Sequence, residues 1–417
     1  MRVTRSTILV ALWCLAPLAL AADDTGKRAE PWQTASWPQW RGPDRTGVSE
    51  ETGLAASWPE SGPKELWRRP LGQGFSAIVV DAGRLYTQYG AGDAAYLAAL
   101  SAADGSELWK VHTGTSFKDS YGNGPRATPT LEAGILYALS SSGDLLAVKA
   151  SDGEVVWQHD LREAFGAKPP RWGLSGSPLI EGDLVIVNPG GDEGRSILAL
   201  DKNTGELRWS ARNDRAGYAG PVAMTLAGVR QILVFVGDKL VSLDPADGET
   251  FWELGWKTDW GVNASTPIQL VGNRVFLSTG YERGAIMLEV SKTESGVQAE
   301  ELWRNREMRN KFSSSVLYGG MLYGFDEGTL KCVDPANGTT RWRQRGLGHG
   351  SLFAADGKLI ALSDRGKLVL LEATPEGYTE LGSVEAFKTK TWTVPTLAGG
   401  RLYVRDEKEI VALDISR

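Results

Sequence analysis

Short apolar runs, each flanked by polar residues and glycine, recur along the chain after residue 63. Runs of this kind, rich in branched and aromatic side chains and bounded by turn residues, predict β-strands. No helical periodicity competes with this pattern. A glycine turn precedes an apolar strand at eight places, which are Gly83, Gly134, Gly182, Gly228, Gly272, Gly320, Gly357 and Gly400. The chain is therefore predicted to be all-β.

A second feature, a short unit that ends in tryptophan, recurs at a similar interval. Most of these units begin with a small residue and have glycine at the seventh and tryptophan at the eleventh position, as in residues 199–209. The structural tryptophans of the repeat are Trp67, Trp109, Trp157, Trp209, Trp252, Trp303 and Trp342. Four dipeptides in these units predict type I′ hairpin turns, with positive φ at both central residues, namely Asp104-Gly105, Asp152-Gly153, Asp247-Gly248 and Asn337-Gly338.

Each unit is predicted to form four short antiparallel strands, and repetition every ~40–50 residues is typical of β-propeller blades. We expect eight blades, stacked radially with the tryptophans between neighbours. The last unit ends near residue 414 without an outer strand. Residues 64–67 are predicted to supply that strand and so to close the ring. Unit five has an insertion around residues 292–300, and Leu381 stands where unit seven would have tryptophan.

The beginning of the chain has the composition of an export signal. Arg2 and Arg5 precede an apolar run at residues 8–22 that ends in small residues. This predicts a signal peptide over residues 1–22, cleaved near Ala21-Ala22, and a mature protein in the periplasm or outside the cell. The run is short for a bilayer span, and no membrane span is expected. The remaining chain is divided into an N-terminal arm (residues 23–62) and the propeller (residues 63–417).

Composition narrows the classes of function. Lys and Arg number 45 against 51 Asp and Glu, a formal net charge of −6, which does not suit a nucleic-acid backbone. Only two cysteines occur, which excludes a disulfide-dense fold and a cysteine-rich metal site, and Cys332 is expected to be a small buried filler. His112, His159 and His349 lack metal-ligand spacing, so no metal is predicted. A monomer is expected.

The repeat resembles a known family of propellers. Residues 199–209 (ALDKNTGELRW) resemble the tryptophan-docking repeat of pyrroloquinoline quinone (PQQ) propellers. Residues 37–43 (WPQWRGP), 124–129 (GPRATP) and 228–231 (GVRQ) resemble exported bacterial proteins with PQQ-binding-like β-propeller repeats. The resemblance covers nearly the whole mature chain. The resemblance implies two possible kinds of function, each known from a better-known relative. One is that of the quinoprotein alcohol dehydrogenases. The other is that of the propeller lipoprotein of the outer-membrane assembly machinery, which has no enzymatic activity.

The chain departs from both relatives. The dehydrogenases commonly have two adjacent cysteines, and longer loops that hold Ca²⁺ and a catalytic Asp, none of which can be assigned here. The assembly lipoprotein has a lipidated cysteine, but Trp13 precedes Cys14 here, where a lipoprotein signal has a small residue. We therefore expect a non-catalytic ligand- or protein-binding propeller without a cofactor. The alternative is a PQQ-dependent alcohol or sugar dehydrogenase with Ca²⁺ on the quinone and a carboxylate such as Asp259 as base. A polysaccharide-binding or lyase-like propeller is a third class.

The segments that lead into the innermost strands are expected to line one mouth of the central channel. A cation or an aromatic residue recurs in nearly every segment, although the chain is net acidic. Converging cations would focus a positive potential there, and aromatic faces would stack a flat ligand. The mouth is therefore predicted to bind a flat anionic ligand, an acidic peptide segment or an envelope protein. The candidate ligand-binding residues are Arg126, Arg171, Trp172, Tyr218, Trp260, Asn263, Lys311, His349, Lys390 and Trp392.

Overall fold

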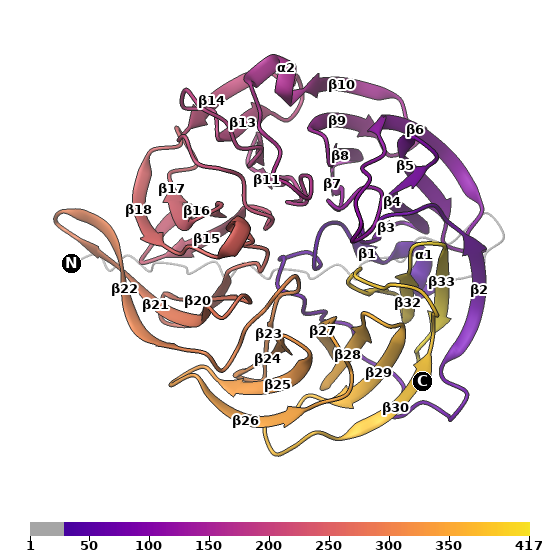
Figure 1. The fold of residues 1–417 in the computed structure, drawn as a ribbon. Coiled ribbons are helices and arrows are strands. Elements are labelled where there is room, and N and C mark those ends of the chain that lie inside the picture. Colours follow the sequence, from indigo (N-terminus) through magenta and orange to yellow (C-terminus); the bar gives the residue numbers. More distant parts are fainter. Residues whose placement is uncertain (1–28) are drawn as a thin grey trace, which may run out of the picture.

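The computed structural model describes residues 29–417. The predicted signal peptide and the first residues of the predicted arm lie outside the described residues. Eight antiparallel sheets stand around a central channel like the blades of a propeller (Figure 1). Helical structure in the described part is limited to α1 (Pro31–Thr34), α2 (Leu161–Phe165) and the 3-10 helix η1 (Asp259–Gly261). The prediction of an all-β, eight-bladed propeller of four-stranded blades is confirmed.

Each blade is a meander whose strands run in order from the channel to the rim. Blades 1 to 4 contain, from the inside outward, β3 (Val79–Asp81), β4 (Arg84–Ala91), β5 (Ala94–Ser101) and β6 (Glu107–Thr115); β7 (Thr130–Glu132), β8 (Ile135–Leu139), β9 (Asp144–Lys149) and β10 (Val155–Asp160); β11 (Leu179–Glu181), β12 (Leu184–Val187), β13 (Ile197–Asp201) and β14 (Leu207–Ala211); and β15 (Val222–Leu226), β16 (Val229–Phe235), β17 (Lys239–Leu243) and β18 (Thr250–Gly255). Blades 5 to 8 contain, in the same order, β19 (Ile268–Leu270), β20 (Arg274–Thr279), β21 (Gly284–Thr293) and β22 (Gly296–Asn305); β23 (Val316–Tyr318), β24 (Met321–Asp326), β25 (Thr329–Asp334) and β26 (Thr339–Gln344); β27 (Gly350–Ala355), β28 (Lys358–Ser363), β29 (Lys367–Glu372) and β30 (Glu380–Glu385); and β31 (Thr396–Ala398), β32 (Arg401–Arg405), β33 (Glu409–Asp414) and β2 (Lys64–Pro70).

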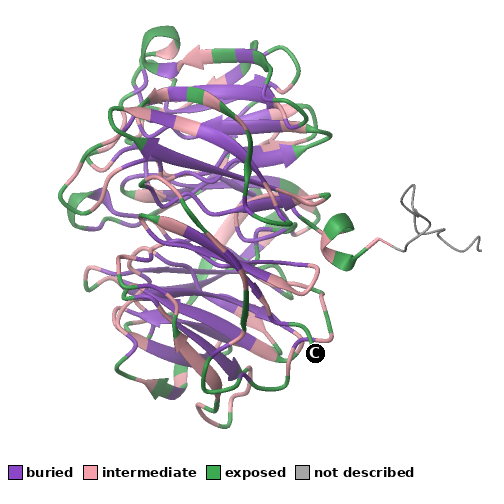
Figure 2. Cartoon of the chain, turned by 90° about the vertical axis from the view of Figure 1, so that its right-hand side faces the viewer, coloured by how far each residue is buried: buried purple, intermediate pink, exposed green. Residues whose placement is uncertain are grey.

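The core lies between the blades. All five residues of β13 are buried, because neighbouring blades cover both faces of the sheet. One hydrophobic cluster joins Leu97 of blade 1 to Leu146 of blade 2. In the side view, buried residues fill the interior of the blades and exposed residues gather in the connecting loops (Figure 2). This two-sided burial explains why the strands are continuous apolar runs rather than alternating patterns.

Two kinds of hairpin turn occur in each repeat, and one prediction about them is wrong. The turns before tryptophan at Asp104-Gly105, Asp152-Gly153, Asp247-Gly248 and Asn337-Gly338 are not type I′, because only the glycine has positive φ. The preceding residue instead uses its side chain as an acceptor, as when Asp152 Oδ1 accepts the N–H of Glu154 at 2.9 Å. Positive φ at both central residues, as type I′ requires, occurs instead at most inner hairpins, as at Ala82-Gly83, where φ is 45° and 76°.

Six of the seven repeat tryptophans connect one blade to the next. The indole N–H of each donates to a backbone carbonyl of the following blade at 2.7–3.2 Å, and the pairs are Trp67 with Ala102, Trp109 with Ala150, Trp157 with Lys202, Trp209 with Pro245, Trp303 with Pro335, and Trp342 with Thr374. The ring also lies on the repeat glycine. A Cβ at Gly205 would lie 2.8 Å from the Trp157 ring, so only glycine fits.

Two blade junctions depart from this rule. The Trp252 indole donates to Gln231 Oε1 of its own blade at 2.9 Å. In the next blade, the predicted insertion extends β21 and β22 into a hairpin with ten residues in each strand. At blade 7, Trp58 of the arm packs against the strand that lacks the repeat tryptophan. Its backbone N–H donates to Leu381 O at 3.0 Å.

The ring is closed by the N-terminal strand, as predicted. Strand β2 pairs antiparallel with β33, from Lys64 opposite Asp414 to Pro70 opposite Glu409. Trp67 then reaches the carbonyl of Ala102 in blade 1 at 3.1 Å. The outer strand of blade 8 therefore also joins that blade to the first one.

The arm crosses the channel and contacts every blade (Figure 1). Strand β1 (Ser36–Trp37) pairs with β3 of blade 1, and residue 48 forms a bridge with β27 of blade 7. Other polar contacts reach the remaining blades, and their partners in the ring are Leu131, Pro178, Pro221, Thr266, Ser315 and Gly399. In the side view, α1 stands out from one face of the disc (Figure 2).

Two buried arginines of the arm donate to backbone carbonyls of the ring. The Arg45 guanidinium donates to the carbonyls of Pro178 and, at 3.0 Å, Pro221. Arg41 Nη2 donates to Ser315 O at 2.5 Å. Desolvation by burial lowers the pKa of both side chains to about 9, so both are charged at neutral pH. Arg45 thus has as counter-dipoles the carbonyls that lead into two neighbouring inner strands, and Arg41 has those of Ser315 and of Thr46 in the arm.

Candidate functional site

A cavity of about 550 Å³ lies at the face of the ring where the chain enters the innermost strands. We call it the mouth cavity. Its size falls in the range of small-molecule sites, ~300–1,000 Å³. Eight of the ten candidate residues line it, namely Arg126, Arg171, Trp172, Tyr218, Trp260, Lys311, His349 and Trp392. The fold thus brings together residues from blades 2 to 8, although their binding role stays a prediction.

The other two candidate residues lie outside the lining. Asn263 is fully buried, and its Nδ2 donates to Val236 O at 2.8 Å, so its side chain holds a loop. Lys390 Nζ donates to the carbonyl of Tyr121 and lies 4.5 Å from the centroid of the Trp392 ring. Lys390 therefore supports the wall of the cavity and does not line it.

Several lining residues were not among the candidates. They include Trp40, Phe75, Tyr121, Tyr281, Phe312 and Asp364. Phe75 leads into the innermost strand of blade 1, so the rule that found the others also applies to it. Tyr281 and Asp364 lie in the turns between the second and third strands, which return to the same face. Nothing in the repeat pattern locates Trp40, because it belongs to the arm.

Aromatic rings form two groups on the cavity wall. The ring centroids of Phe312 and Trp392 are 4.7 Å apart. The Phe75 centroid lies 5.1 Å from that of Trp392, and the His349 centroid lies 5.2 Å from that of Phe312. The second group consists of Tyr121, Trp172 and Tyr218, with centroids 6.0–6.2 Å apart. These rings are tilted or edge-on to one another, an arrangement that stabilises the group while leaving ring faces for a ligand.

Two arginines give the cavity positive charge. Arg126 lies 4.6 Å from the Phe117 ring and donates to the carbonyls of Gly122 and Gly124. Burial lowers the pKa of Arg126 to about 10, so it remains charged at neutral pH. The Arg171 guanidinium lies 5.3 Å from the Trp172 ring and 5.2 Å from the Trp260 ring. Within residues 29–417, Arg171 makes no ion pair or side-chain hydrogen bond.

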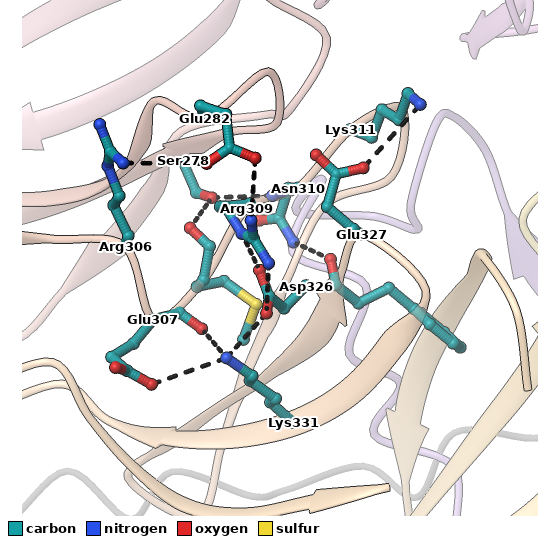
Figure 3. A network of polar contacts seen from close by, with 12 residues as sticks. Ser278, Glu282, Arg306, Glu307, Arg309, Asn310, Lys311, Asp326, Glu327 and Lys331 are labelled. Carbon is teal, nitrogen blue, oxygen red and sulfur yellow. Dashed lines mark hydrogen bonds and ion pairs between the residues drawn. The ribbon is translucent and has the colours of Figure 1, made fainter. Parts of the chain in front are cut away.

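Lys311 belongs to a polar network at the junction of blades 5 and 6 (Figure 3). Its Nζ lies 3.8 Å from Glu327, so its charge is largely compensated. Behind it, Asp326 accepts from Arg309 and Lys331, each at 2.7 Å. Burial alone would raise the pKa of Asp326, but these two cations outweigh burial and the pKa lies below its usual range. The network therefore fixes the loop that carries Lys311.

Two buried polar atoms of lining residues have no hydrogen-bond partner in the described chain. Trp392 Nε1 and Asp364 Oδ1 are both buried without a hydrogen bond. The Asp364 backbone is held firmly, because its N–H donates to His349 O at 2.7 Å and its carbonyl accepts from Thr391 at 3.2 Å. A buried polar group left unpaired costs ~1–3 kcal/mol.

The lining does not fit a calcium ion. Calcium takes ~6–8 oxygen ligands, mostly from carboxylates and carbonyls. Asp364 is the one carboxylate among the lining residues, and Asp259 lies exposed on η1, outside the lining. In the described range, 29–417, no three His, Cys, Asp or Glu side chains cluster as a metal site would require. Burial raises the pKa of Cys332 to about 11, so this thiol is not poised as a nucleophile.

None of the helices in the described part of the chain combines the length and apolar character that crossing a bilayer requires. The longest α-helix, α2, has five residues.

Comparison with known proteins identifies the family. The family model described as "Outer membrane protein assembly factor BamB" matches residues 43–167, 93–344 and 326–417. The outer membrane protein assembly factor BamB of Salmonella typhimurium is 25% identical over 357 residues, 72% of this chain and 86% of that protein.

Solved structures share the fold. The quinohemoprotein alcohol dehydrogenase of Comamonas testosteroni superposes with a TM-score of 0.66 at 14% identity, covering 93% of this chain and 82% of that one. BamB of Moraxella catarrhalis superposes with a TM-score of 0.59 at 14% identity, covering 84% of this chain and 99% of that one. The three matches together extend over residues 43–417. The chain therefore belongs to this family of PQQ-repeat propellers, whose model has the description of the assembly factor BamB.

Proposed function

We propose that this protein is a non-catalytic binding propeller of the cell envelope and that its mouth cavity binds an anionic group of its ligand. The observation that carries the proposal is the placement of Arg171. Its exposed guanidinium lies near two indole rings and has no counter-ion within residues 29–417. An unpaired guanidinium presents a fork of donors suited to a carboxylate or phosphate. Similarity to an assembly factor supports a binding role.

The proposal includes export. The charged and apolar pattern of residues 1–22 has the form of a cleaved signal peptide. Relatives named as outer membrane assembly factors fit an envelope location. In that compartment, the ligand would be a small anionic molecule or an acidic part of an envelope component.

Calorimetric titration of the purified protein tests the proposal. The probes are PQQ, citrate, a uronate trisaccharide and the acidic peptide tri-glutamate, at low salt. We expect at least one probe to bind, and Arg171→Ala to weaken it about tenfold, as loss of a charge-assisted hydrogen bond predicts. Arg195→Ala, an exposed arginine outside the lining, is the matched control. If no probe binds, or if Arg171→Ala binds as tightly as the unchanged protein, the proposal is wrong.

A PQQ-dependent alcohol or sugar dehydrogenase is the second candidate function. Structural similarity to a quinohemoprotein alcohol dehydrogenase over 93% of this chain favours it. The lining of the mouth cavity argues against this function, because it has a single carboxylate, whereas a calcium ion on the quinone needs several oxygen ligands. The test is dye reduction by the purified protein with PQQ and Ca²⁺ against a panel of alcohols and sugars. Turnover would replace the binding proposal, whereas PQQ retention without turnover would support it.

A further inference from the structure

A second cavity, of about 340 Å³, lies beside the arm, and its lining includes Glu181 at the end of β11 farthest from the mouth cavity. We call it the arm-side cavity. We propose that it binds an extended, basic peptide segment of a partner protein, which pairs through its main chain with the inner strands of blades 3 to 5. This inference goes beyond the proposed function, because it concerns a different cavity and a different class of ligand.

The arm bonds to the inner strands in only part of the ring. Strand β1 pairs with β3 of blade 1, and the carbonyl of Pro38 accepts the N–H of Leu131 in blade 2 at 2.8 Å. The next backbone bond to the ring is at blade 7, where the Ala354 N–H donates to the carbonyl of Gly47 at 2.9 Å. Residues 39–46 thus cross the channel directly from blade 2 to blade 7. In the described chain, no backbone hydrogen bond of the arm reaches blades 3 to 5.

The inner strands direct alternate backbone groups into the channel. Val80, Leu131 and Ala354, which pair with or bond to the arm, each precede by one residue the pair that flanks a two-residue turn. In an antiparallel pair, the backbone groups of alternate residues point away from the neighbouring strand. Ile180 of blade 3 has the same place in its strand, opposite Val185. The backbone N–H and C=O of Ile180 therefore face the channel, on the side of the arm-side cavity.

Burial distinguishes the covered strand edges from the open ones. Val80 is fully buried beneath the arm, whereas Ile180 and Ala223 of blade 4 are only partly buried, and Gln269 of blade 5 is exposed. These last three residues all line the arm-side cavity. The carbonyl of Thr225 in blade 4 accepts from Gln269 Nε2 at 2.8 Å, so this edge already binds a donor from outside its own sheet. An open strand edge is a template for a further strand.

The arm shows which kind of occupant suits these edges. It is an extended segment that bonds to blades 1, 2 and 7 through its backbone, and blades 3 to 5 present the same kind of edge to a cavity that the arm leaves free. Peptides that bind to a sheet edge gain affinity from main-chain hydrogen bonds. A cavity near the lower end of the usual range, ~300–1,000 Å³, suits a few extended residues rather than a folded element.

The charges of the lining favour a basic segment. Glu181 and Arg230 form a bidentate pair, with both N–O distances 2.7 Å. Arg45 is buried and donates to carbonyls of the ring. Asp44 is exposed and, within residues 29–417, makes no ion pair or side-chain hydrogen bond, so its carboxylate is available to a lysine or arginine of the peptide. The net charge of −6 also attracts a basic ligand.

Selection from a random heptapeptide library displayed on phage tests the inference. The enriched peptides are then synthesised and titrated by calorimetry against the purified protein. We expect them to contain lysine or arginine. We also expect N-methylation of their central backbone amides to weaken binding at least tenfold, because it removes main-chain donors.

Variants locate the binding site. Ile180→Pro removes an N–H that faces the channel and leaves the bonds between β11 and β12, so we expect about tenfold weaker binding, whereas Ile180→Val keeps the N–H and should bind normally. Asp44→Asn should weaken binding about threefold, as loss of an exposed ion pair predicts. Its control is Asp183→Asn, an exposed carboxylate outside the lining. Thermal unfolding confirms that each variant is folded, and Asp44→Asn with the N-methylated peptides decides the matter if Ile180→Pro does not fold.

Four results would overturn the inference. They are no enrichment, enriched peptides without a basic residue, affinity unchanged by N-methylation or by Asp44→Asn, and a dimer in size-exclusion chromatography that Ile180→Pro dissociates, which would make a second copy of this chain the occupant. Arg171→Ala should bind the peptides as the unchanged protein does. Loss of peptide binding in that variant would place the peptide in the mouth cavity, so the inference would fail while the proposed function would stand.

Discussion

Trp209 shows how one side chain joins two blades. Its indole is 8% exposed, donates to Pro245 O of the next blade at 3.0 Å and lies against Gly248. Removal of the ring would leave a cavity between two sheets and a carbonyl without its donor. Both effects act at the blade junction, where most of the apolar surface is buried.

We expect Trp209→Ala to lower the free energy of unfolding by ~3–5 kcal/mol, the usual cost of truncating a large buried aromatic residue. Urea unfolding followed by circular dichroism measures this change. Leu207→Ala is the control, since Leu207 lies on the same strand but is 40% exposed and should change stability by less than ~0.5 kcal/mol. Equal losses for the two variants would show that the indole does not hold the blades together.

Single residues also show how much of the candidate site could be predicted from the sequence. Residues such as Arg126 and Trp392 were found because each stands at an equivalent point of the repeat. Asp364 was missed because it lies in a different turn that returns to the same face. Asn263 was placed in the lining wrongly, because one position along the loop decides whether a side chain faces the cavity or the core.

At the level of the element, the two hairpin turns of a blade have different requirements. Gly205 needs positive φ and also room for the Trp157 ring, whereas Gly134 needs only positive φ. The strands, their order and the glycine positions could be predicted from the repeat. The type of turn could not, because Asp-Gly suits both a two-residue turn and a longer loop in which the aspartate accepts a backbone hydrogen bond.

These requirements predict different costs for two Gly→Ala substitutions. Gly134→Ala, where a Cβ meets nothing within 4 Å, should cost ~1–2 kcal/mol from backbone strain alone. Gly205→Ala should cost a further ~1–3 kcal/mol, because its Cβ would overlap the Trp157 ring. Denaturant midpoints of the two variants give the comparison. If Gly134→Ala loses as much stability as Gly205→Ala, the ring contact is not what selects glycine.

At the level of the whole molecule, the arm crosses the channel and connects the inner strands of all eight blades. The repeat pattern predicted the ring and its closure, because both follow from the number and completeness of the units. The path of the arm has no such pattern and emerges only from tertiary contacts such as those of Arg41 and Arg45. Trp40, which faces the mouth cavity, is positioned by the same segment.

Arg45→Ala tests whether the arm stabilises the ring. The variant leaves the carbonyl of Pro221 without its donor and that of Pro178 with only the Thr130 hydroxyl, and we expect a loss of at least ~2 kcal/mol in the free energy of unfolding. Asp44→Ala, an exposed neighbour, should stay within ~0.5 kcal/mol of the unchanged protein. A loss in Arg45→Ala no larger than in Asp44→Ala would show that the arm rests on the ring without stabilising it.

The pairing of β2 with β33 determines when folding can finish. Strand β2 precedes blade 1 in the sequence, but its partner β33 follows the other strands of the ring, with Lys64 opposite Asp414. Blades 1 to 7 can form before β33 is available, but blade 8 and the arm contacts with it require strands β31 to β33. Contacts so distant in sequence form slowly. The ring therefore stays open, with an unpaired sheet edge, until β2 and β33 have paired.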